Sequence, residues 1–212
     1  MRMNRAYAVI PFLISALALT GASASGGASA APKCLGKTAT IVRGDGDNQI
    51  TGTNGNDVIV AGGGADSIDA KGGKDRVCGG AGNDQVVAGP GNDSVSGGSG
   101  KDQMVGQEGD DTLKGGGGND EMVGAGGDDV LSGGPGNDQM VGAEGDDRLS
   151  GGAGKDLIVG GEDFDQMSGG KDDDRIFADD GLGGEAVDGG DGTDDTCMAD
   201  ATDNVSNCEN AF

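Results

Sequence analysis

Aspartate recurs at every ninth residue along the middle of this 212-residue chain, and its carboxylates are the side chains best suited to do chemistry. Fourteen aspartates share the spacing: Asp57, Asp66, Asp75, Asp84, Asp93, Asp102, Asp111, Asp120, Asp129, Asp138, Asp147, Asp156, Asp165 and Asp174. Carboxylates combined with loop carbonyls make hard oxygen sites, which suit Ca²⁺, or Mg²⁺ with retained water. Because flexible loops tolerate a variable number of ligands, the pattern favours Ca²⁺ as the cofactor.

The composition excludes several classes of function. The chain has no His, which excludes a Ser-His-Asp triad, a Cys-His pair and any His-bearing metal site. Its formal net charge of −23 would repel nucleic acid and anionic membrane surfaces, so we expect neither as a partner. The regularly spaced aspartates belong to a repeat and no room remains for a separate catalytic domain. We therefore predict that the chain is not an enzyme.

The aspartates sit in a tandem repeat of nine residues. Fifteen units follow one another without insertion over residues 43–177. Gly prevails at positions one, two and four, where it allows a turn with positive φ, and Asp occupies position six in every unit except the first, which has Asn48. Position eight is aliphatic in all fifteen units. Such strict periodicity predicts a solenoid, although composition alone would predict disorder.

The repeat also predicts how the aspartates are positioned. Positions seven to nine form a short strand in which only position eight points inward, so the aliphatic side chains pack between two thin sheets. Consecutive units lie on opposite sheets, which makes one coil 18 residues long. From residue 97 the units alternate between a type with Met-Val or Ile-Val and a type with Asp-Asp and Leu, as two distinct sheets require. Loops on the same edge then lie about 4.8 Å apart.

The pattern G-G-x-G-x-D-x-U-x resembles the haemolysin-type, or repeats-in-toxin, calcium-binding nonapeptide. The resemblance covers 135 residues, and it implies an all-β, right-handed parallel β-roll, a two-sheet β-solenoid with Ca²⁺ bound in its turns. The position-six aspartates would supply the side-chain ligands and loop carbonyls would complete the shell. An export signal followed by little besides these repeats is similar to secreted calcium-binding repeat proteins of actinobacteria.

Calcium is expected to be needed for folding. Without a cation, stacked aspartates about 4.8 Å apart repel one another, and the small aliphatic core cannot offset the ordering of so many Gly-rich residues. We expect the chain to fold on binding multiple Ca²⁺ ions, with thirteen gaps between neighbouring loops as a ceiling on their number. A calcium-independent solenoid is the alternative. Loops with Asn48, Lys71, Asp163 or Asp172 in place of the consensus residue should bind more weakly. Position-five acids such as Asp110 and Asp128 should neutralise charge or be solvated, and direct binding of the metal by them is the alternative.

The two ends differ from the repeat. Residues 1–30 read as a cleaved signal peptide, with two Arg, an uncharged apolar stretch and two small-residue cleavage patterns, which predicts a secreted, extracellular protein. Residues 31–42 would form an N-terminal cap, and residues 178–212 a C-terminal cap containing one degenerate unit, Gly189 to Asp194. Four cysteines allow three pairings, and proximity favours Cys34–Cys78 and Cys197–Cys208 as disulfides that staple the ends. A four-Cys metal site lacks any C-x-x-C pair.

One outer face of the predicted roll is apolar. Position nine on one sheet contains Val87, Val105, Val123, Val141, Val159 and Phe177, which would stack as an outward stripe. Ordinary β propensity explains a valine row equally well, and the alternative is a face for self-association or a cell-surface partner. The function predicted from the sequence is calcium binding. An extracellular adhesin or matrix protein that uses Ca²⁺ as a folding switch is the alternative.

Overall fold

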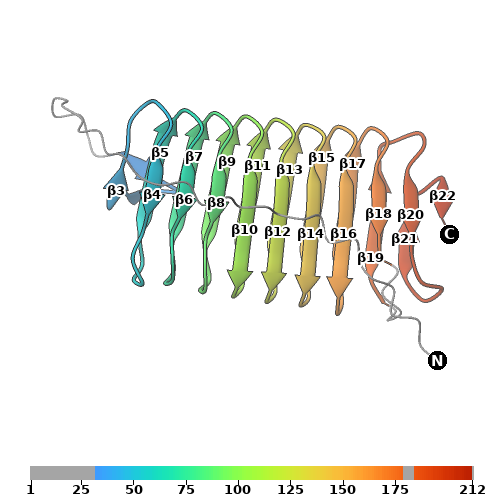
Figure 1. Ribbon diagram of the computed structural model, residues 1–212. Coiled ribbons are helices and arrows are strands. Elements are labelled where there is room, and N and C mark those ends of the chain that lie inside the picture. Colours follow the sequence, from blue (N-terminus) through green and yellow to red (C-terminus); the bar gives the residue numbers. More distant parts are fainter. Residues whose placement is uncertain (1–31, 179–183, 212) are drawn as a thin grey trace.

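The structure of the chain is a computed structural model that describes residues 32–178 and 184–211. It contains two ten-stranded sheets, whose strands follow one another along a single flattened stack (Figure 1). The even sheet consists of β4 (Gln49–Thr51), β6 (Ser67–Asp69), β8 (Gln85–Val87), β10 (Gln103–Glu108), β12 (Glu121–Gly126), β14 (Gln139–Glu144), β16 (Leu157–Glu162), β18 (Arg175–Phe177), β20 (Thr196–Met198) and β22 (Asn210–Ala211). The odd sheet consists of β3 (Ile41–Val42), β5 (Val58–Gly63), β7 (Arg76–Ala81), β9 (Ser94–Ser99), β11 (Thr112–Gly117), β13 (Val130–Pro135), β15 (Arg148–Ala153), β17 (Gln166–Lys171), β19 (Ala186–Gly190) and β21 (Asn204–Ser206).

Both sheets are parallel, and their register confirms the 18-residue coil. Met104 of β10 pairs with Met122 of β12, and Leu113 of β11 pairs with Leu131 of β13. Successive units alternate between the sheets, so the predicted two-sheet β-solenoid is confirmed. In the middle coils the strands are longer than predicted, because positions one to three of the following unit also join the ladder. In the described part of the chain no helix is long and apolar enough to span a membrane.

The hydrophobic core is a thin stack of aliphatic side chains between the two sheets. The position-eight side chains of both sheets are buried and form one hydrophobic cluster, which Val187 and Cys197 extend toward the C-terminal end. From the second unit on, position one also points inward and contains only Gly or Ala, whereas Arg43 at position one of the first unit is exposed. The reason is space, since a Cβ on Gly79 would overlap the carboxylate of Asp84 in the same unit. The thin core therefore leaves room for a buried carboxylate in every loop.

Backbone turns with positive φ make the loops possible. Gly82, at position four, has a φ of 124°, and a Cβ there would collide with the carbonyl oxygen of Gly64 one coil earlier. The two position-four aspartates adopt the same left-handed conformation, with φ of 73° at Asp163 and 72° at Asp172. Asp tolerates this region better than most residues, so these two loops keep the geometry of their neighbours.

Both ends of the roll carry disulfides, and both predicted pairings are confirmed. Cys34 lies in an antiparallel hairpin of β1 (Lys33–Cys34) and β2 (Lys37–Thr38) and bonds to Cys78 of β7. Cys197 of β20 bonds to Cys208. The segment that we predicted as a C-terminal cap continues both sheets as β19 to β22, although its register departs from 18 residues. The predicted signal peptide, residues 1–30, lies outside the described residues.

Candidate metal sites

The fourteen predicted aspartates form two columns, one along each edge of the roll. In the even column each aspartate immediately precedes a strand of the even sheet, and in the odd column a strand of the odd sheet. Burial is almost complete in both columns, since Asp57 is 8% exposed and the other thirteen are at most 3% exposed. An ionised carboxylate tolerates such burial only when its oxygens are satisfied by hydrogen bonds or a cation.

One oxygen of each carboxylate has a structural role that the sequence did not reveal. Oδ1 accepts the backbone N–H of the position-six residue one coil earlier, as when Asp84 Oδ1 accepts from Asp66 at 2.9 Å. The same bond, at 2.7–2.9 Å, repeats from Asn48 to Asp174 along both edges. The aspartates thus join successive coils directly, in addition to any metal that they bind.

In twelve of the fourteen predicted aspartates the second oxygen accepts no hydrogen bond. Oδ2 is buried and accepts no hydrogen bond in a set that spans both columns: Asp66, Asp75, Asp84, Asp93, Asp102, Asp111, Asp120, Asp129, Asp138, Asp147, Asp156, Asp174 and Asp195. It points into its own loop, where a Cβ placed on Gly79 would meet both Asp84 Oδ2 and the Gly97 carbonyl oxygen of the next coil. A carboxylate oxygen and a backbone carbonyl oxygen thus lie close together in the loop, and both are hard oxygen donors of the kind that Ca²⁺ binds.

Asn48 tests this interpretation inside the same structure, because it replaces Asp at position six of the first unit. Its amide nitrogen Nδ2 donates to the carbonyl oxygens of Gly44, at 3.1 Å, and of Gly46, and to Asp66 Oδ1 at 2.9 Å. The amide NH₂ group, which has a positive partial charge, thus binds three oxygens: the carbonyl oxygens of positions two and four in its own loop and a carboxylate oxygen of the next coil. The corresponding oxygens of the other loops fit Ca²⁺, which accepts six to eight oxygen ligands.

The ligands of such an ion must include backbone groups. In the described residues no three His, Cys, Asp or Glu side chains come together as a metal-binding group. Asp57 also differs from the other aspartates, because its Oδ2 accepts two hydrogen bonds from Thr53, one from the backbone N–H at 2.7 Å and one from the Thr53 hydroxyl at 2.9 Å. Asp57 Oδ2 therefore has protein partners, whereas the Oδ2 atoms of the set named above do not.

Burial raises the pKa of most of these carboxyl groups. Desolvation is the largest cause, the backbone N–H bonded to Oδ1 opposes it, and carboxylates on neighbouring coils add to it in most cases. The pKa reaches about 6 at Asp93, Asp102, Asp129, Asp138 and Asp174, about 7 at Asp111 and Asp156, and about 8 at Asp147. The ionised form of each of these carboxyl groups is therefore disfavoured in the metal-free roll, and a bound proton or cation would stabilise it.

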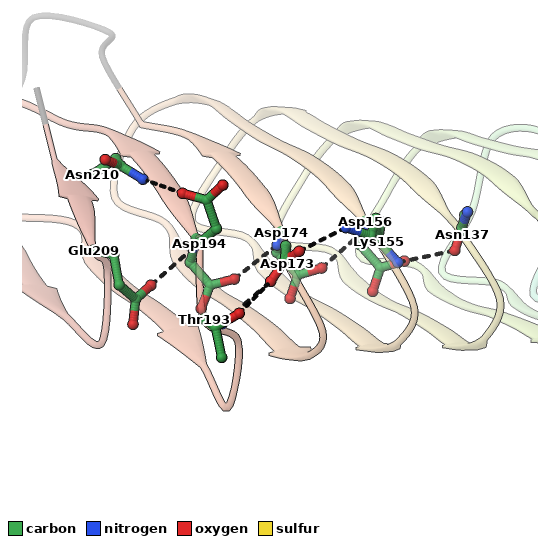
Figure 2. Close-up of polar contacts among 10 residues, drawn as sticks. Asn137, Lys155, Asp156, Asp173, Asp174, Thr193, Asp194, Glu209 and Asn210 are labelled. Atoms are coloured by element: carbon green, nitrogen blue, oxygen red, sulfur yellow. Dashed lines mark hydrogen bonds and ion pairs between the residues drawn. The ribbon is translucent and has the colours of Figure 1, made fainter.

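The even column continues beyond the predicted repeats. Asp174 donates its N–H to Asp195 Oδ1 at 2.7 Å, and Asp195 donates to Glu209 Oε2 at 2.9 Å (Figure 2). The degenerate unit therefore presents Asp195, not Asp194, at the sixth position, and Asp194 instead accepts a hydrogen bond from Asn210. Extra residues place Asp195 21 residues after Asp174, so a strict nine-residue spacing missed it. The Asp-x-Cys197 spacing, with Cys197 in place of the aliphatic residue, was the available signal.

The comparison with known families agrees with this geometry. The sequence matches the RTX calcium-binding nonapeptide repeat over residues 43–77, 79–113, 96–131, 114–149, 132–167 and 150–182. The chain belongs to this family. No curated protein sequence matches it. As an RTX repeat protein, the chain is expected to bind Ca²⁺ in the loops whose second carboxylate oxygen has no protein partner.

Proposed function

We propose that this RTX repeat protein is a secreted calcium-binding protein that folds when several Ca²⁺ ions bind between its stacked loops. The observation that carries the proposal is the repeated, buried Oδ2 without a partner. One such oxygen costs about 1–3 kcal/mol, more for a charged group, and the two columns repeat this cost coil after coil. Without cations the ionised roll is therefore strongly destabilised.

Each residue type in the loop has a distinct part in this mechanism. Position-six Oδ1 holds the N–H of the preceding coil, which leaves Oδ2 directed into the loop. Position-one Gly leaves space for that oxygen, and positive φ at positions two and four allows the loop to turn, as at Gly80 and Gly82. Bound Ca²⁺ supplies the positive charge that converts repulsion between coils into attraction. No step of this function requires catalysis.

Secretion explains why folding should depend on a metal. A chain with 37 acidic residues stays extended where Ca²⁺ is scarce, as inside a cell, and would fold after export where Ca²⁺ is abundant. The disulfides Cys34–Cys78 and Cys197–Cys208 support export, because such bonds persist in oxidising compartments. They would then fix the two ends of a roll that calcium has assembled.

A far-UV circular dichroism titration tests the proposal. The chain is treated with chelator and titrated with Ca²⁺, and the titration is repeated with Mg²⁺. We expect a cooperative gain of β signal with Ca²⁺ alone. Persistent β structure in excess chelator would contradict calcium-dependent folding, and a spectrum that responds to neither ion would contradict metal binding by the aspartates.

We also propose that the outer face of the even sheet binds a second copy of the chain. Its position-nine residues pair in register from Val87 through Val123 to Phe177 and are only half-buried. From Ser96 to Ser168 the same position on the odd sheet contains only Ser or Lys, so strand geometry alone does not demand valine. Parallel sheets are usually covered on both faces.

Light scattering on the calcium-loaded chain and on Val123→Lys tests this contact. A dimer of the wild-type chain that the substitution converts to monomer would support it. A monomeric wild-type chain, or a dimer that Val123→Lys does not affect, would exclude it. Ser132→Lys, at the same position on the odd sheet, serves as the matched control and should leave the dimer intact.

A further inference from the structure

The two edges of the roll have the same backbone design but different charge. Four successive loops of the odd edge form the acidic edge and contain eleven Asp or Glu and no Lys or Arg: residues 106–111, 124–129, 142–147 and 160–165. Four loops on the opposite edge alternate with them along the chain, form the low-charge edge and contain four Asp and two Lys: residues 97–102, 115–120, 133–138 and 151–156. The formal charges are therefore −11 and −2.

Position five causes most of this difference. On the acidic edge Asp110, Asp128 and Asp146 are exposed and stacked, because Asp110 Oδ1 accepts the N–H of Asp128 at 3.3 Å and Asp128 Oδ1 accepts that of Asp146 at 3.1 Å. In the part of the chain that the structure describes, no Lys or Arg forms an ion pair with these three carboxylates. They therefore stack without a neutralising partner.

Position five on the low-charge edge is uncharged or basic. Asn137 Oδ1 accepts the N–H of Lys155 at 2.9 Å, which is the same ladder bond made without a carboxylate (Figure 2). The ammonium group of Lys155 extends to Asp173 at 2.6 Å, and that of Lys101 to Glu121 at 2.8 Å. The ladder thus needs only an oxygen acceptor, so the negative charge at position five of the acidic edge is not required for coil stacking.

The buried oxygens of the acidic edge lie in the same loops as this surplus charge. Oδ2 of Asp111, Asp129 and Asp147 has no partner, and these residues are at most 1% exposed. Asp111 Oδ2 points into its own loop, where it would overlap a Cβ on Gly106. A cation held by these oxygens therefore has a second carboxylate on the adjacent residue, which a cation on the low-charge edge lacks.

We propose that the roll has two classes of calcium site, and that the acidic edge binds Ca²⁺ more tightly and is occupied first. The inference rests on the proposed calcium binding and adds an order of loading to it. An additional carboxylate about 6 Å from a divalent ion strengthens binding about tenfold even at the dielectric constant of water. Salt weakens this contribution, because the position-five carboxylates are exposed.

Isothermal titration calorimetry of the calcium-free chain tests the proposal. We expect two classes of site that differ at least tenfold in affinity. The triple variant Asp110→Asn, Asp128→Asn, Asp146→Asn keeps every ladder acceptor and should weaken the tight class about tenfold or more without changing the weak class. The control variant Asp45→Asn, Asp47→Asn, Asp188→Asn removes the same charge from the first loop, where Asn48 replaces the aspartate, and from β19, and it should leave both classes unchanged.

Amide NMR shifts identify the edge that loads first. With increasing Ca²⁺, position-four glycines of the acidic edge, such as Gly127, should reach their final shifts before those of the low-charge edge, such as Gly136. A single class of sites, earlier saturation of the low-charge edge, or a triple variant indistinguishable from the control would overturn the inference and leave calcium binding intact. Failure of the wild-type chain to bind Ca²⁺ at all would instead overturn the proposed function and the inference with it.

Discussion

Replacing a single buried aspartate by asparagine should change stability in opposite directions with and without calcium. Asp102→Asn is the most informative substitution, because Asp102 is 0% exposed and its Oδ1 already accepts the N–H of Asp84 at 2.8 Å. Asparagine keeps that acceptor. Its amide nitrogen, which replaces the unpartnered Asp102 Oδ2, can donate to loop carbonyl oxygens, as Asn48 Nδ2 does to those of Gly44 and Gly46.

The size of the effect follows from the pKa of Asp102. Burial raises that pKa from 3.8 to about 6, so ionised Asp102 destabilises the metal-free roll by up to about 3 kcal/mol at pH 7.5. Screening by solvent reduces this to about 1–2 kcal/mol. In chelator, Asp102→Asn should therefore favour the folded state by about that amount. With Ca²⁺ present it removes a charged ligand and should raise the calcium midpoint of folding about tenfold.

Circular dichroism measures both effects. In chelator, trimethylamine N-oxide, which favours buried surface, is added to bring the chain into its folding transition, and the variant should fold at a lower concentration of the osmolyte. In the calcium titration it should fold at a higher concentration of the metal. Asp188→Asn on the outer face of β19 is the control for charge alone. A shift of the same sign in both titrations would refute the assignment of Asp102 Oδ2 as a calcium ligand.

Three further predictions concern the pH, the glycines and the disulfides. Burial raises the folded-state pKa of Asp147 from 3.8 to about 8, so its protonation stabilises the metal-free roll as pH falls through 8, and this stabilisation is lost as pH rises. β structure measured in chelator and osmolyte should therefore increase from pH 8.5 to pH 5.5. The calcium-loaded roll should respond in the opposite way, because acid displaces the metal. Gly82→Ala should destabilise the calcium-loaded roll by more than about 2 kcal/mol in urea unfolding. Gly117→Ala should destabilise it by about 1 kcal/mol at most, because a Cβ at Gly117 meets no atom within 4 Å and φ there is not positive. Removing Cys34–Cys78, which are separated by 44 residues, should cost about 4 kcal/mol in the same assay, and equal stability of the reduced and oxidised chains would contradict a stapling role.

Local spacing predicted most of the fold. Strands with a period of nine residues, a coil of 18 and inward aliphatic side chains such as Met122 follow from the repeat, because one small unit must meet the same constraints fifteen times. The cysteine pairing followed from proximity. The continuation of the sheets to β22 did not, because the insertions around residues 178–195 change the spacing while the strands still stack in parallel.

The sequence by itself determined which residues face the loops, the hard oxygen chemistry of the aspartates and the strong negative charge of the chain. Only the tertiary structure decided how each carboxylate divides its two oxygens, since Oδ1 bonds a backbone N–H from one coil earlier while Oδ2 stays buried without a partner. That division joins residues 18 positions apart, and so it exists only once the coils are stacked. Asp57 and Asp84 hold the same position in the repeat but differ in the fold, because Thr53, four residues before Asp57 in the same unit, donates two hydrogen bonds to Asp57 Oδ2.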